Sequence, residues 1–211
     1  MEQTLRATVT GKSMETLAQE SLQEAIWIAG SKSGDAASFN HLVLKWERPI
    51  YNLALRMLQD ADEAAEATQE VFLRAFKSIR GFRADSAFST WLYRIAANQC
   101  ISRLRQRPSQ AHYSMDDQEA MKSLAGSLPR RESHEGAVLA EETRVEVRRA
   151  LARLPADQRL VVELKFFQDM TFEQIAPIVE APVSTVKSRF YTGLESLKSR
   201  LGRYEPGTER R

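Results

Sequence analysis

The stretch from Thr171 to Leu201, TFEQIAPIVEAPVSTVKSRFYTGLESLKSRL, contains two short helical patterns separated by a break. Thr171 followed by Gln174 forms a capping box, which predicts where the first helix begins. The break at Pro182 precedes Ser184, a residue type that favours a helix start. Two short helices joined by a tight turn predict a helix-turn-helix, whose second helix enters the major groove of DNA.

The second of these helices separates into two faces. Apolar residues recur every three or four positions and predict a core-facing stripe: Val183, Val186, Phe190, Leu194, Leu197 and Leu201. Short donors and two cations in its N-terminal half are the candidate contacts to duplex DNA: Ser184, Thr185, Lys187, Ser188 and Arg189. A basic helix alone is more often a solvated surface, so the preceding helix and turn are what favour DNA recognition.

Helical periodicity covers most of the remaining chain, and strand-like alternation is almost absent. Further helices are expected at residues 36–58, 62–79, 89–107, 138–154 and 155–167. The sequence therefore predicts an all-α fold of two small helical domains, residues 21–107 and 138–204. Residues 108–137 lack an apolar stripe and are expected to form a flexible linker. Residues 1–20 and 205–211 are expected to be an N-terminal extension and a tail.

The bulk composition limits the possible functions. The chain has 211 residues, is 43% hydrophobic and carries a net charge of only +2, so an argument for nucleic-acid binding must be local. Cys100 is the only cysteine, which excludes an intramolecular disulfide and favours a cytoplasmic location. The sequence contains no run of 18 apolar residues, so no membrane-spanning helix is expected.

The densest local positive charge lies between Arg74 and Arg107. This segment has eight Lys or Arg residues and only one acidic residue, Asp85. This excess suits a track of DNA phosphates. The segment includes GFRADSAFSTWLYRIAANQCISRLRQR, from Gly81 to Arg107. Aromatic residues at helical spacing more often pack in a hydrophobic core than stack on a nucleic-acid base. The side-chain amide of Asn98, in contrast, offers both a hydrogen-bond donor and an acceptor to a base.

Four quoted segments resemble one known family. MTFEQIAPIVEAPVSTVKSRFYTGLESL (170–197) resembles region 4 of sigma factors, the bacterial RNA polymerase initiation subunits, and in particular the extracytoplasmic-function (ECF) type. GDAASFNHLV (34–43), DADEAAEATQEVFLRAFKSI (60–79) and GFRADSAFSTWLYRIAANQCISRLR (81–105) resemble parts of region 2, in the family's order. The resemblance covers residues from about 23 to 107 and from 138 to 204.

The resemblance implies a non-enzymatic promoter-specificity subunit that binds core polymerase through its β′ and β subunits. The duplex contacts on the last helix are then expected to read the −35 element. The residues expected to bind polymerase are Asp62, Glu66, Gln69, Glu70 and Leu73. The residues expected to bind and melt the −10 element, partly as single strands, are Arg80, Phe82, Arg83, Asp85, Ser86, Asn98, Arg103 and Arg105. An anti-sigma factor is an expected partner, and no cofactor, metal or small-molecule substrate is expected.

This sequence departs from the family pattern in the helix-turn-helix. Glu180 stands in the turn and Ser184 before the Thr, where family members commonly have glycine. Pro177 lies six residues into the first helix and is expected to kink or shorten it.

Two other functional classes compete with this interpretation. A one-component regulator could combine the same helix-turn-helix with a ligand-sensing N-terminal domain, but the basic, aromatic-rich end of that domain argues against it. An enzyme is disfavoured because the three histidines, His41, His112 and His134, lack metal-ligand spacing, and no phosphate loop or hydrolase motif occurs.

Overall fold

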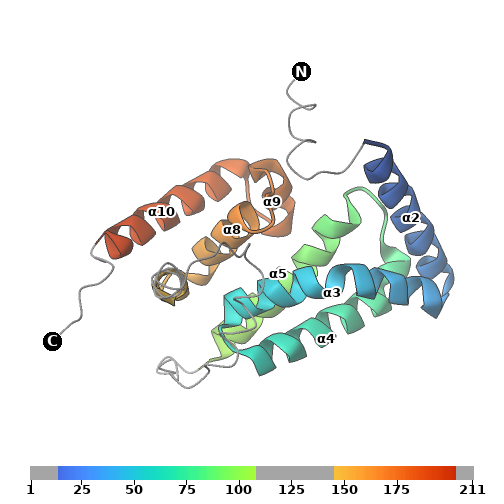
Figure 1. Cartoon of the computed structure of the whole chain (residues 1–211), viewed down its shortest axis with the longest axis horizontal. Coiled ribbons are helices and arrows are strands. Elements are labelled where there is room, and N and C mark those ends of the chain that lie inside the picture. Colours follow the sequence, from blue (N-terminus) through green and yellow to red (C-terminus); the bar gives the residue numbers. More distant parts are fainter. Residues whose placement is uncertain (1–13, 108–144, 203–211) are drawn as a thin grey trace, which may run out of the picture.

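The computed structural model describes residues 14–107 and 145–202, which form helices joined by short turns (Figure 1). The N-terminal half contains α2 (Met14–Ser33), α3 (Ala36–Leu58), α4 (Ala61–Ser78), the 3₁₀ turn η1 (Ile79–Gly81) and α5 (Phe88–Gln106). The C-terminal half contains helical residues 145–152, then α8 (Ala156–Phe166), α9 (Phe172–Ile178) and α10 (Val183–Leu201). The expected all-α class is confirmed. The linker expected at 108–137 and the tail at 205–211 lie outside the described residues.

Capping carboxylates stabilise the first turns of α3 and α4. Asp35 accepts hydrogen bonds from the backbone amides of Ala37 and Ser38 at the start of α3, and Asp60 accepts one from Glu63 at the start of α4. Helices α3, α4 and α5 then pack pairwise and bury the apolar stripes that the periodicity predicts. Among the described helices, none is both long and apolar enough to cross a membrane.

No helix was predicted over the residues of α2, and its first part, residues 14–20, falls in the expected N-terminal extension. Helix α2 packs against α3 through polar and aromatic contacts, and its own apolar stripe is weak. Trp27 stacks on His41 with 5.0 Å between ring centroids, and the indole N–H of Trp46 donates to Glu24 at 2.6 Å. These partners lie on different helices, so only the tertiary structure reveals why α2 forms.

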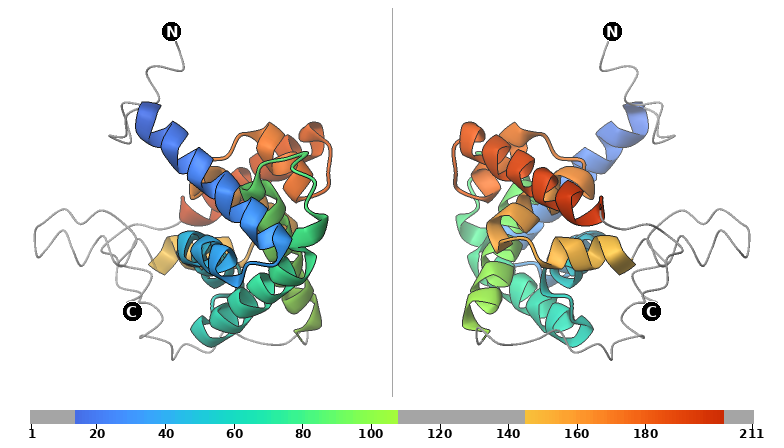
Figure 2. Two further views of the ribbon diagram at one scale, coloured as in Figure 1. Left: turned by 90° about the vertical axis from the view of Figure 1, so that its right-hand side faces the viewer. Right: turned by 90° about the vertical axis from the view of Figure 1, so that its left-hand side faces the viewer.

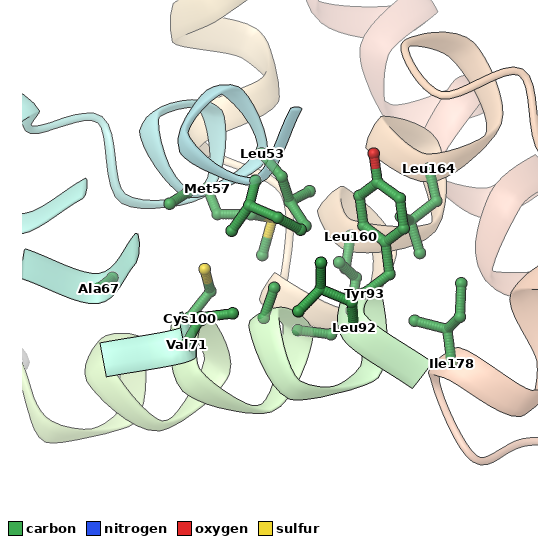
Figure 3. Close-up of a cluster of buried hydrophobic side chains, with 14 of the residues drawn as sticks. Leu53, Met57, Ala67, Val71, Leu92, Tyr93, Cys100, Leu160, Leu164 and Ile178 are labelled. Atoms are coloured by element: carbon green, nitrogen blue, oxygen red, sulfur yellow. The ribbon is translucent and has the colours of Figure 1, made fainter. Parts of the chain in front are cut away.

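The two halves pack directly against each other, with α8 and α9 on α3 and α5 (Figures 1 and 2). Buried side chains of both halves form one hydrophobic cluster. In Figure 3, Leu92 and Tyr93 of α5 lie among Leu160 and Leu164 of α8 and Ile178 of α9. The chain thus has two helical units by sequence but one continuous core in space.

The helix-turn-helix begins with the predicted capping box. The Thr171 hydroxyl accepts from the Gln174 amide at 3.2 Å, and the Thr171 amide donates to the Gln174 side chain at 2.8 Å. Helix α9 has only seven residues and ends one residue after Pro177, so the proline shortens the helix and does not kink its middle. Pro182, not Ser184, occupies the N-cap of α10, so the N-cap lies two residues earlier than predicted.

A residue other than glycine adopts a left-handed backbone conformation in the turn of the helix-turn-helix. Glu180 adopts a φ of 51°, in the left-handed region. A side chain with a Cβ costs about 1–2 kcal/mol there. Its carboxylate lies 3.8 Å from Arg94, but both side chains are largely exposed, so this pair offsets little of the strain.

Replacing Glu180 with Gly is expected to stabilise the protein by about 0.5–1 kcal/mol, because relief of the backbone strain exceeds the added entropy of the unfolded chain. Urea-induced unfolding followed by circular dichroism measures this change. Glu180→Ala is the matched control, since it removes the same charge and keeps the strain. An equal gain in both variants would show that strain is not the cause.

Candidate nucleic-acid interface

The loop of residues 82–87 connects η1 to α5 and presents polar side chains to solvent. Arg83, Asp85 and Ser86 are all exposed. Ala84 adopts a φ of 60°, which bends the loop sharply. The Lys32 ammonium of α2 donates to the Phe82 carbonyl at 2.9 Å and holds the beginning of the loop. The loop is therefore exposed to solvent, and α2 anchors its first residue.

An aromatic cluster packs on the buried side of this loop and supports it. Phe82, Phe88 and Trp91 contact one another with ring centroids 5.3–5.8 Å apart. Phe82 was expected among the DNA contacts, but only 6% of its surface is exposed. Its ring packs against the other two because burial of a large apolar surface is favourable. Phe82 thus supports the loop, and its ring does not offer a stacking face to a base.

Helix α5 exposes a polar stripe beyond the loop. Asn98, Ser102 and Arg105 are exposed along one side, while Gln99 and Cys100 are buried on the other. A free amide at Asn98 can donate to and accept from a base edge. Arg80, at η1, is also exposed. These side chains are available for a nucleic-acid strand running along α5.

The basic end of α5 interlocks with the acidic face of α4. Arg103 pairs with Glu66 at 3.1 Å and with Glu70 at 3.5 Å, and Arg107 pairs with Glu63 at 2.6 Å. A hydrogen bond from Arg74, with further help from Arg103, holds the pKa of Glu70 below its ordinary value.

A residue expected to contact DNA, Arg103, is therefore engaged by two carboxylates expected to contact polymerase. Periodicity could not find this pairing, because it depends on how α4 crosses α5. Arg105 is exposed and leaves one cation of this end available for DNA.

The rest of the exposed α4 surface combines apolar and polar groups. Leu73 is 52% exposed and Phe76 is 46% exposed, whereas Phe72 is buried. Gln69 is exposed one helical turn before Leu73, and Asp62 is exposed in the first turn of the same helix. An apolar centre with a polar rim is typical of a protein-binding surface.

Helix α10 presents the second candidate DNA surface. Ser184, Lys187 and Ser188 are exposed in its N-terminal half, while Thr185 and Arg189 are half-buried. Arg189 forms an ion pair with Asp157 of α8 at 3.1 Å. Val186 and Phe190 are buried on the opposite side, so the core holds the polar face outward.

Within residues 14–107 and 145–202, no three His, Cys, Asp or Glu side chains come together to hold a metal ion. His41 stacks on Trp27. Cys100 is fully buried, and this burial raises the pKa of its thiol to about 12.

Comparison with known families matches both halves separately. The family "Sigma-70 region 2" matches residues 42–109, and "Sigma-70, region 4" matches residues 144–197. The chain is 36% identical to the RNA polymerase sigma-H factor of Pseudomonas aeruginosa over 171 residues, covering 80% of this chain and 88% of the relative. It is 32% identical to the ECF RNA polymerase sigma-E factor of Escherichia coli K12 over 185 residues, covering 86% and 96%.

Solved structures share the fold. CnrH in complex with the cytosolic domain of CnrY superposes with a TM-score of 0.64 at 20% identity, covering 87% of this chain and 99% of the other. The sigma factor RpoE in complex with the anti-sigma factor NepR, from Bartonella quintana, gives 0.57 at 21% identity, covering 79% and 98%.

Because its thiol is buried and protonated, Cys100 is expected to react with iodoacetamide at pH 8 at least about 100-fold more slowly than a free cysteine. Mass spectrometry of the intact protein measures the labelled fraction over time, and the urea-unfolded chain serves as the control. Rapid labelling of the folded protein would contradict the packing of α5.

Proposed function

The chain belongs to the sigma-70 family, in its ECF group, and from this premise we propose how its residues divide the work of promoter recognition. The protein is a promoter-specificity subunit of bacterial RNA polymerase, which binds the core enzyme and recognises and melts promoter DNA to start transcription. One observation carries this conclusion: both DNA-binding regions of the family match in order within a chain that spans 96% of a sigma-E factor.

In this proposal, residues 21–107 act as region 2 and hold the melted −10 element. The exposed loop residues Arg83, Asp85 and Ser86 contact a base that has left the stack, and Asn98 contacts a neighbouring base. Arg80 and Arg105 neutralise phosphates along the strand. Phe82 acts indirectly, since its buried ring supports the loop.

Residues 138–204 act as region 4 and read the −35 element as duplex. Helix α10 enters the major groove with Ser184, Lys187 and Ser188 foremost. Thr185 and Arg189 lie at the edge of this surface. To contact DNA, Arg189 must either break its ion pair with Asp157 or contact DNA while keeping that ion pair.

The exposed side of α4 is the proposed docking surface for the β′ subunit. Leu73 supplies an apolar anchor, with Asp62 and Gln69 as part of its polar rim. Glu66 and Glu70 also belong to this surface, and in the free protein they hold Arg103. Polymerase binding at these carboxylates would release Arg103 toward DNA. Contacts to the β subunit complete the attachment.

The regulatory partner proposed for this chain is an anti-sigma factor, as the Bartonella quintana RpoE has in NepR. Exposed apolar side chains on α8 and α10 suit a protein partner, among them Phe166 and Tyr191, each 60% exposed. The proposed location is the cytoplasm, where polymerase and promoter DNA are found. The chain has no proposed catalytic activity of its own.

Run-off transcription with core polymerase and promoter fragments tests the proposal as a whole. New start sites that depend on the added protein are expected. A one-component regulator, the alternative class, would instead bind an operator tightly without polymerase, so a gel shift of the free protein separates the two functions.

Asn98→Ala is expected to slow open-complex formation about tenfold, because one lost base contact costs about 1–3 kcal/mol. Potassium permanganate footprinting of unpaired thymines measures the opening, and binding to core polymerase should not change. Asn40→Ala is the matched control, since Asn40 is an exposed amide on α3 outside the proposed surfaces. Equal opening by both variants would exclude Asn98 from the strand contact.

Lys187→Ala is expected to weaken binding of the holoenzyme to −35 duplex and to lower the slope of log affinity against log salt by about 1, as one phosphate contact is lost. Fluorescence anisotropy over a salt series measures both quantities. Lys198→Ala removes an equally exposed cation from the last turn of α10 and should leave the slope unchanged. The same slope for the wild type and Lys187→Ala would refute the contact.

A further inference from the structure

The corner between α2 and α3, residues 30–35, carries a side chain that reaches the loop of residues 82–87 from outside it. We propose that Lys32 is a positioning residue for promoter recognition: its ammonium fixes the backbone of this loop, and the fixed loop determines which unstacked base the protein prefers. This role rests on the proposed function, in which the loop holds a base that has left the stack.

The corner between α2 and α3 is rigid because the end of α2 is capped by its own backbone. Gly34 adopts a φ of 99°, and its amide donates to the Ser31 carbonyl at 3.1 Å. The amide of Asp35 donates to the Gly30 carbonyl at 3.0 Å. These two bonds form a Schellman motif, which satisfies the last carbonyls of a helix and favours glycine at its left-handed position. The side chain of Asp35 caps α3, so Lys32, in the last turn of α2, projects from a fixed corner.

The side chain of Lys32 meets the loop at its first residue. Its Nζ atom donates to the Phe82 carbonyl at 2.9 Å, across 50 residues of sequence. A hydrogen bond donated by a charged group is about twice as strong as one between neutral groups. This single bond therefore connects the corner to the beginning of the loop.

Phe82 is held from two sides, which fixes the direction of the chain as it enters the loop. Its ring packs against Phe88 and Trp91, and its carbonyl accepts from Lys32. Two residues later, Ala84 adopts a φ of 60°. A residue with a Cβ keeps this conformation only where the surrounding structure imposes it. The exposed polar side chains of the loop therefore start from an orientation that its held end imposes.

The corner also lies beside a proposed phosphate contact. A Cβ atom placed on Gly34 would lie 3.4 Å from the Nη2 atom of Arg80, so the guanidinium lies next to the end of α2. The C-terminal end of a helix attracts cations, because the carbonyl dipoles point toward it. The end of α2 thus contacts both Arg80 and the Phe82 carbonyl, on the two sides of Gly81.

A fixed loop matters because discrimination between bases depends on small distances. Groups that recognise one ligand must be held within about 0.5 Å of the productive geometry. A loop that is free to move still brings its side chains to the DNA strand, but in several geometries that suit several bases. Loss of the Lys32 bond is therefore expected to reduce the preference for one base more than the affinity for the strand.

Lys32→Met is the test variant, since methionine keeps most of the length of the side chain and removes the donor. The probe is a promoter identified by run-off transcription, with its −10 element held unpaired in a bubble and each of the four bases placed in turn at every unpaired position. Fluorescence anisotropy of the holoenzyme measures the affinities. We expect the wild type to prefer its best base over its worst by about tenfold at the position that the loop reads. Lys32→Met should reduce this preference to about twofold and leave the other positions unchanged.

Two further variants separate positioning from a general effect on α2. Lys32→Arg keeps a charged donor and should keep the wild-type preference. Lys45→Met is the matched control, because Lys45 connects α3 to α2 through Glu24, at 3.1 Å and two helical turns from Lys32. It should also keep the preference. Circular dichroism should show unchanged helicity for every variant.

Equal weakening of all four bases by Lys32→Met would overturn the positioning role, since a purely structural role predicts that result. A slope of log affinity against log salt lowered by about 0.7, with the base preference intact, would show a direct phosphate contact and overturn it as well. A wild type without any base preference would refute the proposed function of the loop, and this role with it. A wild-type preference that survives in Lys32→Met would overturn only the role of Lys32, so the two failures are distinguishable.

Discussion

The arrangement of this molecule depends on the buried ion pair between Arg56 and Glu163. A carboxylate removed from water is tolerated only where a cation compensates it, and Arg56 at the end of α3 is the partner that reaches Glu163. Arg159, one turn earlier on α8, secures the same contact through the Met57 carbonyl. The apolar cluster around Tyr93 can form continuously across both halves because Arg56 compensates the charge of Glu163 there.

Helix α5 serves several structural roles because its faces meet different environments. Leu92 and Cys100 lie in the core, Tyr93 reaches the C-terminal half, and Asn98 is exposed. A mutation on one face therefore tests one role, as long as it leaves the other faces packed. Arg103 is the exception, because its pairs with α4 connect the proposed DNA surface to the proposed polymerase surface.

Much of the fold was predictable from local patterns. The capping box at Thr171 and Gln174, the stripe through Val186 and Phe190, and the bounds of α3 all depend on residues close in sequence. The proposed site was less predictable, since Phe82 is buried by aromatic neighbours and Arg103 is paired with another helix. Helix α2 was not predicted as a helix, because its apolar periodicity is weak and its contacts with α3 are polar and aromatic.

Local sequence patterns specify every described helix except α2, the order of these helices, the family, and the residue types available to contact DNA and polymerase. Short-range spacing and capping are enough for these features, because they involve neighbours within one or two turns. Only the tertiary structure decided that the two halves share a core and that Arg56 meets Glu163, 107 residues along the chain. No periodic pattern encodes which helix ends meet, since that choice depends on the summed burial and charge compensation of whole surfaces.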